Sequence, residues 1–252
     1  RVSDNVASGT SGSGGGVFSA GSFTATGTEI SDNMANRAGG GIEDAGGTVA
    51  LTDVRLTGNA IDVAAPGNGG GLHSGGGDVT ITRSVVSSNA AVEGGGLWSN
   101  GTLTINGGAE GDDPEDEDAE AGDRTAFTTI ANNTATGADA GTGGGGIYVE
   151  TGGAASVRYA LISENAASGA SGSGGGLLVA DGAMASLAFS EVTGNTANRA
   201  GAGVELFDDV LTTGADDVAT VTLRQVTVAD NAIDTAAPGN GGGLHAGGGA
   251  AV

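Results

Sequence analysis

The sequence has no cysteine, no lysine, three prolines and only 3% aromatic residues. The lack of cysteine excludes a disulfide framework and thiolate metal sites. The scarcity of aromatic residues argues against a conventional core built from large side chains. No run of about twenty apolar residues could span a bilayer, so we expect no direct membrane insertion by this segment.

Glycine and acidic residues are abundant instead, with 53 glycines and 30 Asp and Glu against eight basic residues. The glycines follow no strict three-residue period, which excludes a collagen triple helix. A net charge of −22 repels polyanions, so we expect no nucleic-acid partner. Many acidic residues without lysine are typical of halophilic proteins or of GC-rich genomes. The chain starts at Arg1 without an initiator methionine or signal peptide, and we expect it to be a fragment of a longer array.

Two short signatures alternate along the whole chain, and such self-similarity indicates a repeat architecture. One is a glycine cluster followed by an aliphatic residue, as in Gly39–Ile42. The other is an apolar residue three positions before an asparagine. The eight asparagines, which we call the ladder asparagines, are Asn5, Asn33, Asn59, Asn89, Asn133, Asn165, Asn195 and Asn231. Their spacing runs from 26 residues (33 to 59) to 44 (89 to 133) and is mostly near thirty.

A longer period lies above this unit. The segment NVASGTSGSGGG from Asn5 returns as NAASGASGSGGG from Asn165, and NAIDVAAPGNGGGLH from Asn59 returns almost unchanged from Asn231. Five units are therefore duplicated, and the second copy holds three of them. Each unit also contains alternating apolar and small polar residues bounded by glycine-rich turns, which is a strand pattern.

These patterns predict an all-β fold, a right-handed parallel β-helix of about eight coils with three short strands each. The whole of 1–252 forms one β-helix segment in this prediction. Equivalent residues of successive coils then stack about 4.8 Å apart. The ladder asparagines are expected to bond from coil to coil, and the glycines to allow tight turns and close backbone approach.

The alternating tetrapeptides resemble the repeats of the polymorphic outer-membrane proteins, a family of surface-exposed autotransporter adhesins. The matches include GGGI at Gly39–Ile42, GGGL at Gly94–Leu97, ISDN at Ile30–Asn33 and VSSN at Val86–Asn89. The third small residue is Gly where that family has mostly Ala, and the position before x-x-Asn is aliphatic where the family favours Phe. The resemblance implies a β-helix displayed at the cell surface and names no adhesion partner.

The residue after each post-glycine aliphatic residue should point outward and form a single stripe. This outward stripe gathers Phe18, Glu43, His73, Trp98, Tyr148, Leu178, Glu205 and His245. Phe18, His73, Trp98, Tyr148 and His245 are the candidate contacts for a glycan or protein partner, because aromatic faces stack on sugars and anchor interfaces. The alternative is a stripe covered by loops or by a neighbouring chain.

Glu43 and His73 lie one coil apart, as do Glu205 and His245, which places each pair about 5 Å apart. An acid–base site is one interpretation. An inherited ion-pair ladder is favoured, because both pairs were duplicated with the array.

Two acidic insertions are predicted, at 107–126 and 206–218. The first contains Asp112, Asp113, Asp116 and Asp118, which are candidate oxygen ligands for Ca²⁺. Their spacing fits no EF-hand, and a run of like charges is more often a solvated excursion. No other cofactor is expected.

Serine and threonine residues on another face resemble an ice-binding array, but Ala50, Arg158 and Met184 interrupt it. The function expected from the sequence is a structural or adhesive extracellular surface protein, without catalysis, forming fibres or a surface layer by self-association or binding cell-surface glycan or protein. The alternatives are a polysaccharide lyase or hydrolase and a carbohydrate-binding module, because the same fold serves all three.

Overall fold

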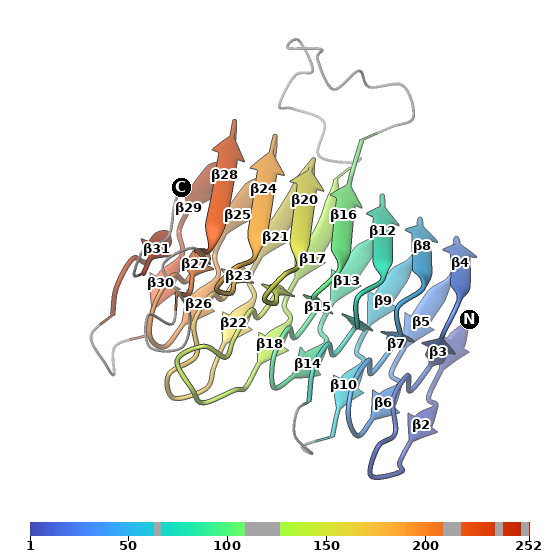
Figure 1. Cartoon of the computed structure of the whole chain (residues 1–252). Helices are drawn as coiled ribbons and strands as arrows, with labels where there is room; N and C mark the ends of the chain where they lie inside the picture. Colours follow the sequence, from blue (N-terminus) through green and yellow to red (C-terminus); the bar gives the residue numbers. More distant parts are fainter. Residues whose placement is uncertain (63–66, 109–126, 209–217, 235–238, 248–251) are drawn as a thin grey trace.

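The computed structural model describes residues 1–62, 67–108, 127–208, 218–234, 239–247 and 252. All regular structure in this part of the chain is β-strand, and every strand pairing is parallel. The strands wind into a parallel β-helix of eight stacked coils (Figure 1). The predicted fold class is confirmed. We number the coils 1 to 8 by their ladder asparagines. The described residues include no helix long and apolar enough to cross a membrane.

Each coil contributes one strand to each of four sheets, except that coil 8 has no described strand in the fourth. Sheet 1 consists of β1 (Val2–Ser3), β5 (Glu29–Ser31), β9 (Arg55–Thr57), β13 (Val85–Ser87), β17 (Thr128–Ala131), β21 (Ala160–Ser163), β25 (Glu191–Thr193) and β29 (Thr227–Ala229). Sheet 2 consists of β2 (Val6–Ala7), β6 (Met34–Ala35), β10 (Ala60–Ile61), β14 (Ala90–Ala91), β18 (Thr134–Ala135), β22 (Ala166–Ala167), β26 (Thr196–Ala197) and β30 (Ala232–Ile233).

The glycine clusters lead from sheet 2 into sheet 3, and a short turn leads on to sheet 4. Sheet 3 consists of β3 (Val17–Ser19), β7 (Ile42–Asp44), β11 (Leu72–Ser74), β15 (Leu97–Ser99), β19 (Ile147–Val149), β23 (Leu177–Val179), β27 (Val204–Leu206) and β31 (Leu244–Ala246). Sheet 4 consists of β4 (Ser22–Thr26), β8 (Thr48–Thr52), β12 (Asp78–Thr82), β16 (Thr102–Asn106), β20 (Ala154–Arg158), β24 (Met184–Ala188) and β28 (Thr220–Arg224).

The coil thus has four strands, where the sequence predicted three. The residue before every ladder asparagine has a left-handed backbone, as at Asp32 (φ 56°) and Gly58 (φ 68°). This conformation ends the strand of sheet 1 and redirects the chain. The two residues after the asparagine then pair with their equivalents as a separate sheet, for example Ala60 with Ala90.

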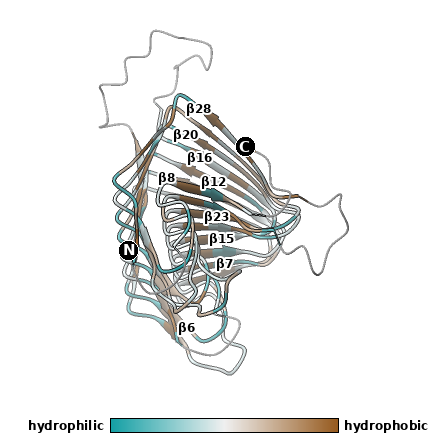
Figure 2. Cartoon of the chain, turned by 90° about the vertical axis from the view of Figure 1, so that its left-hand side faces the viewer, coloured by the Kyte–Doolittle hydropathy of each residue, from teal (hydrophilic) through white to brown (hydrophobic). Residues whose placement is uncertain are grey.

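The core between sheets 1, 3 and 4 is aliphatic and repeats along the axis. Ile30 pairs in register with Leu56, and Leu56 with Val86. All three are fully buried in the main hydrophobic cluster. Figure 2 views the stack of coils from the end that carries the C-terminus and colours it by hydropathy. Stacked identical positions let medium-sized side chains fill a narrow interior, which is why the chain folds with so few aromatic residues.

The ladder asparagines form one continuous chain of side-chain hydrogen bonds. Each Nδ2 donates to the Oδ1 of the next asparagine at 2.9–3.0 Å, from Asn5 through to Asn231. Each backbone N–H from Asn5 to Asn195 donates to the same oxygen. The asparagines at positions 33 to 195 are buried. The ladder therefore satisfies the polar groups of the corner between sheets 1 and 2.

The glycine clusters allow neighbouring coils to approach closely. Gly39 has φ +62°, which favours glycine. A Cβ on Gly40 would collide with the carbonyl oxygens of Gly70 and Ala60 in the next coil. A side chain there would force the coils apart.

The predicted acidic insertions fall largely outside the described residues. Of 107–126, only Gly107 and Gly108 are described, so Asp112, Asp113, Asp116 and Asp118 lie outside the described residues. Leu206, the first residue of the second predicted insertion, is fully buried at the end of β27 and belongs to the coil itself.

Candidate functional site

The residues of the outward stripe lie in register on sheet 3. Phe18 pairs with Glu43, Glu43 with His73, His73 with Trp98, and Trp98 with Tyr148. The series continues through Leu178 and Glu205 to His245. The rings of His73 and Trp98 stack with centroids 4.4 Å apart, and those of Trp98 and Tyr148 lie 6.3 Å apart at an angle of 11°. The stripe is therefore a continuous row in register, as the repeat period predicts, and three of its rings stack.

Loops cover most of this stripe, which is the alternative that the sequence left open, and an exposed contact strip is wrong for those residues. Trp98 and Tyr148 are only 6% and 5% exposed, and His73 is also buried, whereas Phe18 at one end is 58% exposed. The loops between sheets 2 and 3, which we call the covering loops, fold back over sheet 3. The hydroxyl of Tyr148 donates to the carbonyl oxygen of Gly141 in such a loop at 3.0 Å. Phe18 and His245, at the two ends, are the candidate contacts that remain accessible.

Both histidines lie against buried glutamates, and His73 is itself buried whereas His245 is half-buried. Nδ1 of His73 lies 3.0 Å from Glu43, and Nδ1 of His245 lies 2.9 Å from Glu205. Each pair carries an arginine that the sequence did not reveal: Arg37 lies 3.3 Å from Glu43, and Arg199 lies 2.8 Å from Glu205. Burial raises the pKa of the Glu205 carboxyl, and His245 and Arg199 oppose that rise.

The two arginines hold the covering loops. Nε of Arg37 donates to the hydroxyl of Ser13 in the preceding coil at 3.0 Å. Nε of Arg199 donates to the hydroxyl of Ser173 at 2.9 Å, again one coil back. Each Arg–Glu–His triad thus links three successive coils, which supports the ion-pair interpretation over an acid–base site.

A second polar cluster around Trp98 was missed from the sequence. Glu93 lies in the covering loop of coil 4. Burial first and the Glu150 carboxylate second raise its pKa to about 7. Burial and the same two carboxylates raise the pKa of Tyr148. The sequence did carry a signal for Glu93. It directly precedes the glycine cluster of coil 4, at the position that Ser13, Ala38 and Asn68 occupy in coils 1 to 3, and the four residues pair in register.

An aromatic and arginine cluster occupies the corner after sheet 4. Tyr159 and Phe189 stack with centroids 5.2 Å apart, although both have left-handed backbones with φ of 50°. Arg158 and Arg224 lie 5.4 and 5.1 Å from the Phe189 ring. Such distances are typical of cation–π contacts. From the sequence, Arg158 was predicted only to interrupt the hydroxyl array.

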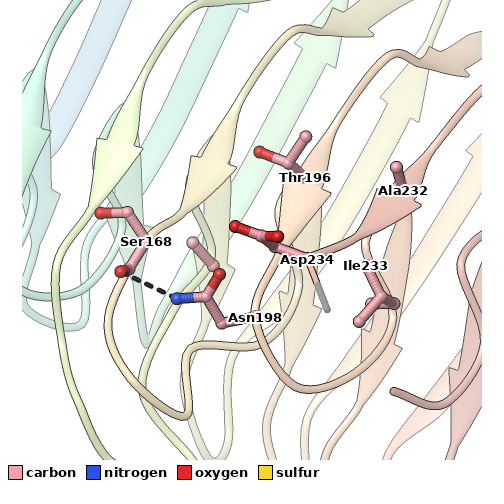
Figure 3. A pocket seen from close by; sticks show the side chains of 7 residues that line it. Ser168, Thr196, Asn198, Ala232, Ile233 and Asp234 are labelled. Carbon is pink, nitrogen blue, oxygen red and sulfur yellow. Dashed lines mark hydrogen bonds between the residues drawn. The ribbon is translucent and has the colours of Figure 1, made fainter. Parts of the chain in front are cut away.

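An open pocket of about 400 Å³ lies on the outer side of sheet 2 in coils 6 to 8 (Figure 3). Its polar lining comes from Ser168, Thr196, Asn198 and Asp234. The Asn198 amide donates to the carbonyl oxygens of Ser168 and Gly169 at 3.1 and 2.9 Å. This amide therefore shapes the wall, and a small polar ligand could enter beside it.

Within the described part of the chain, no three His, Cys, Asp or Glu side chains gather in a way that could hold a metal ion. The carboxylates of both Glu–His pairs are buried, and the open pocket holds one carboxylate. No protein-family model matches the chain, and no curated protein or solved structure matches it significantly.

Proposed function

We propose that this chain is a structural or adhesive extracellular surface protein whose β-helix forms a rigid rod. The observation that carries the proposal is the duplicated Arg–Glu–His triad. In both copies the glutamate is buried, and the arginine and histidine beside it bind neighbouring coils to one another. Side chains that would be catalytic in an open cleft here stabilise the solenoid.

The repeated hydrogen-bonded ladder favours the same role. A ladder that passes through eight coils makes each coil a template for the next, so the length of the rod can grow by duplication. The duplicated five-coil unit of the sequence is such a growth step. The buried contacts repeat while the surface residues vary, which suits a rigid spacer that presents different surfaces along its length. The resemblance to surface adhesins agrees with a location outside the cell.

Self-association is supported by exposed apolar residues at coils 1 and 2. Val6 is 62% exposed and its in-register neighbour Met34 is 41% exposed. The equivalent positions of the second copy are Ala166 and Thr196. Sheet 2 of the first copy therefore presents an apolar pair that the second copy lacks, and copies of the chain can associate side by side through it.

The experiment is a polysaccharide panel combined with a measurement of assembly. We expect no released product, and a particle mass by light scattering that grows with protein concentration. The variant Val6→Ala with Met34→Thr, which installs the second copy's residues, should reduce the growth. Turnover of any polysaccharide would overturn the proposal, and a strictly monomeric wild type would remove self-association from it.

A carbohydrate-binding module is the second candidate, and the pocket of Figure 3 favours it. Hydroxyl, amide and carboxylate groups beside Ile233 suit the polar and apolar faces of a sugar ring. Retention on one polysaccharide without product release, lost in Asp234→Asn and kept in the equivalent first-copy variant Asp62→Asn, would favour this candidate over the adhesin.

A further inference from the structure

Two tripeptides of the sequence match the acceptor pattern for N-linked glycosylation. The pattern is an asparagine, any residue except proline, and then serine or threonine. The two matches are Asn100-Gly101-Thr102 and Asn132-Asn133-Thr134. Every other asparagine of the chain has alanine, glycine or isoleucine at the second position after it. The two tripeptides lie at different depths in the coil, so the structure distinguishes between them.

Asn100 occupies an exposed turn between sheets 3 and 4. It follows β15 directly, and Thr102 begins β16. Coil 3 holds the backbone of this turn. The N–H of Asn100 donates to the carbonyl oxygen of Ser74 at 3.2 Å, and the N–H of Thr102 donates to that of Gly77 at 3.0 Å. Asn100 and Thr102 are both exposed, so a fixed backbone presents the two side chains that define an acceptor site.

Packing explains the middle residue of this tripeptide and not its neighbours. A Cβ on Gly101 would collide with the carbonyl oxygen of Gly77 in the preceding coil, so the turn requires glycine there. The hydrogen bonds found among the described residues include none that involves the Asn100 amide or the Thr102 hydroxyl. These two groups therefore contribute no hydrogen bond to the described fold and stay open to a reaction partner.

The surroundings of Asn100 leave room for a bulky substituent. The equivalent residues of the two preceding coils, which make the same backbone hydrogen bond one coil back, are Gly75 and Ala45. Neither has a side chain long enough to cover the Asn100 amide. On the other side, the Glu150 carboxylate accepts a hydrogen bond from the N–H of its own neighbour Thr151 at 2.8 Å.

The second tripeptide is built into the asparagine ladder. Its middle residue, Asn133, is fully buried and bonded to the coils on both sides. Thr134 is half-buried in β18, and its N–H donates to the carbonyl oxygen of Asn89 at 2.9 Å. Asn132 is exposed but has a left-handed backbone with φ of 58°. A transferase cannot take hold of this tripeptide without breaking the ladder.

We propose that Asn100 is an N-glycosylation site, whereas Asn132 is not modified. The donor is an oligosaccharide linked through phosphate to a polyprenyl lipid. The amide nitrogen of Asn100 forms a bond with the anomeric carbon of the first sugar, the bond from that carbon to the phosphate oxygen breaks, and the amide loses one proton to a base of the transferase. The inference rests on the extracellular location in the proposed function, because this modification belongs to secreted chains.

Peptide mapping by mass spectrometry of the chain isolated from its natural source tests the proposal. The chain has no lysine, so trypsin cleaves it only after arginine. Cleavage after Arg83, Arg124 and Arg158 places the two tripeptides in separate peptides, 84–124 and 125–158. We expect peptide 84–124 to carry a glycan that fragmentation assigns to Asn100, and peptide 125–158 to carry none on Asn132.

Variants made in the same source define the acceptor. Asn100→Gln and Thr102→Ala should each abolish the glycan on peptide 84–124. Thr102→Ser keeps the hydroxyl and should retain it. Asn132→Gln is the matched control and should leave the glycan unchanged, and circular dichroism checks that all four variants fold.

Treatment of intact cells with protease separates this inference from the proposed function. An accessible chain whose Asn100 carries no glycan would overturn the inference and leave the extracellular function standing. A glycan that persists in Thr102→Ala, or that occurs on Asn132 alone, would also overturn it. A chain that is protected inside the cell and unmodified would overturn both.

Discussion

The two copies of the repeat agree beneath the covering loops and differ at the corner after sheet 4. Glu43 and His73 of the first copy return as Glu205 and His245, and Nδ1 of each histidine lies 3.0 and 2.9 Å from its glutamate. At the corner, Gly27 of coil 1 is replaced by Phe189 in coil 6. Likewise Thr52 and Asp53 of coil 2 are replaced by Arg224 and Gln225 in coil 7. Buried polar groups must keep their partners, whereas a surface corner can change as long as its backbone conformation is tolerated.

The corner also shows how an unfavourable backbone is accommodated. Gly27 has φ +57° and Phe189 has φ +50°. A bulky residue in this region costs about 1 kcal/mol or more. The rings of Tyr159 and Phe189, with Arg224 over one of them, supply contacts that offset this cost.

Of the changes considered, breaking the asparagine ladder in its middle should lower the free energy of unfolding most. Asn133 is fully buried, accepts from Asn89 and donates to Asn165. The variant Asn133→Ala leaves several buried polar groups without partners, so we expect a loss of about 3–5 kcal/mol in the free energy of unfolding by urea. Asn5→Ala, at the exposed end, is the matched control and should lose much less. Equal losses would show that burial does not set the strength of the ladder.

The pH dependence of stability should reveal the raised pKa of Glu93. Its pKa is raised from 4.5 to about 7. The folded state therefore binds the Glu93 proton more tightly than the unfolded state does. The resulting contribution to the free energy of unfolding is fully present below about pH 4.5 and is lost as pH rises through about 7. Ionised Glu93 should therefore lower the free energy of unfolding by up to about 3 kcal/mol across that window. Urea unfolding of the wild type and Glu93→Gln at several pH values checks this, and parallel pH profiles for the two would contradict it.

Removing the arginine of a triad should lower the stability by different amounts in the two copies. Arg199→Ala leaves Glu205 without its arginine, and we expect a loss of about 2 kcal/mol in the free energy of unfolding. The Arg37 side chain is 40% exposed against 23% for Arg199, so solvent screens its pair more strongly. Arg37→Ala should therefore lose about 1 kcal/mol or less. Thermal unfolding of both variants tests this order, and a larger loss for Arg37→Ala would reverse it.

The smallest effect is expected at the corner. Phe189→Gly restores the first copy's residue, removes both the backbone strain and the ring contacts, and should change stability by less than about 1 kcal/mol. Phe189→Ala keeps the strain and loses the contacts, so it should be less stable than Phe189→Gly by about 1 kcal/mol. The comparison requires only the difference between the two Tm values. A more stable alanine variant would show that the backbone there is not strained.

Periodicity made the stacked parts of the structure predictable. The eight asparagines, the aliphatic core and the order of the stripe all follow from a coil that places equivalent residues in register. The fourth strand was missed because strands of two residues, such as Ala90–Ala91, carry no alternation to detect. Arg37 and Arg199 were missed as partners because they reach their glutamates from a covering loop.

What the sequence determined by itself was the coil, because a thirty-residue period forces equivalent residues into parallel register whatever lies between them. What only the tertiary structure decided was accessibility. The path of a glycine-rich loop is not set by local pattern, since glycine permits many conformations. Whether Trp98, Tyr148 and Glu93 face solvent or lie beneath neighbouring chain therefore depended on where the covering loops pack.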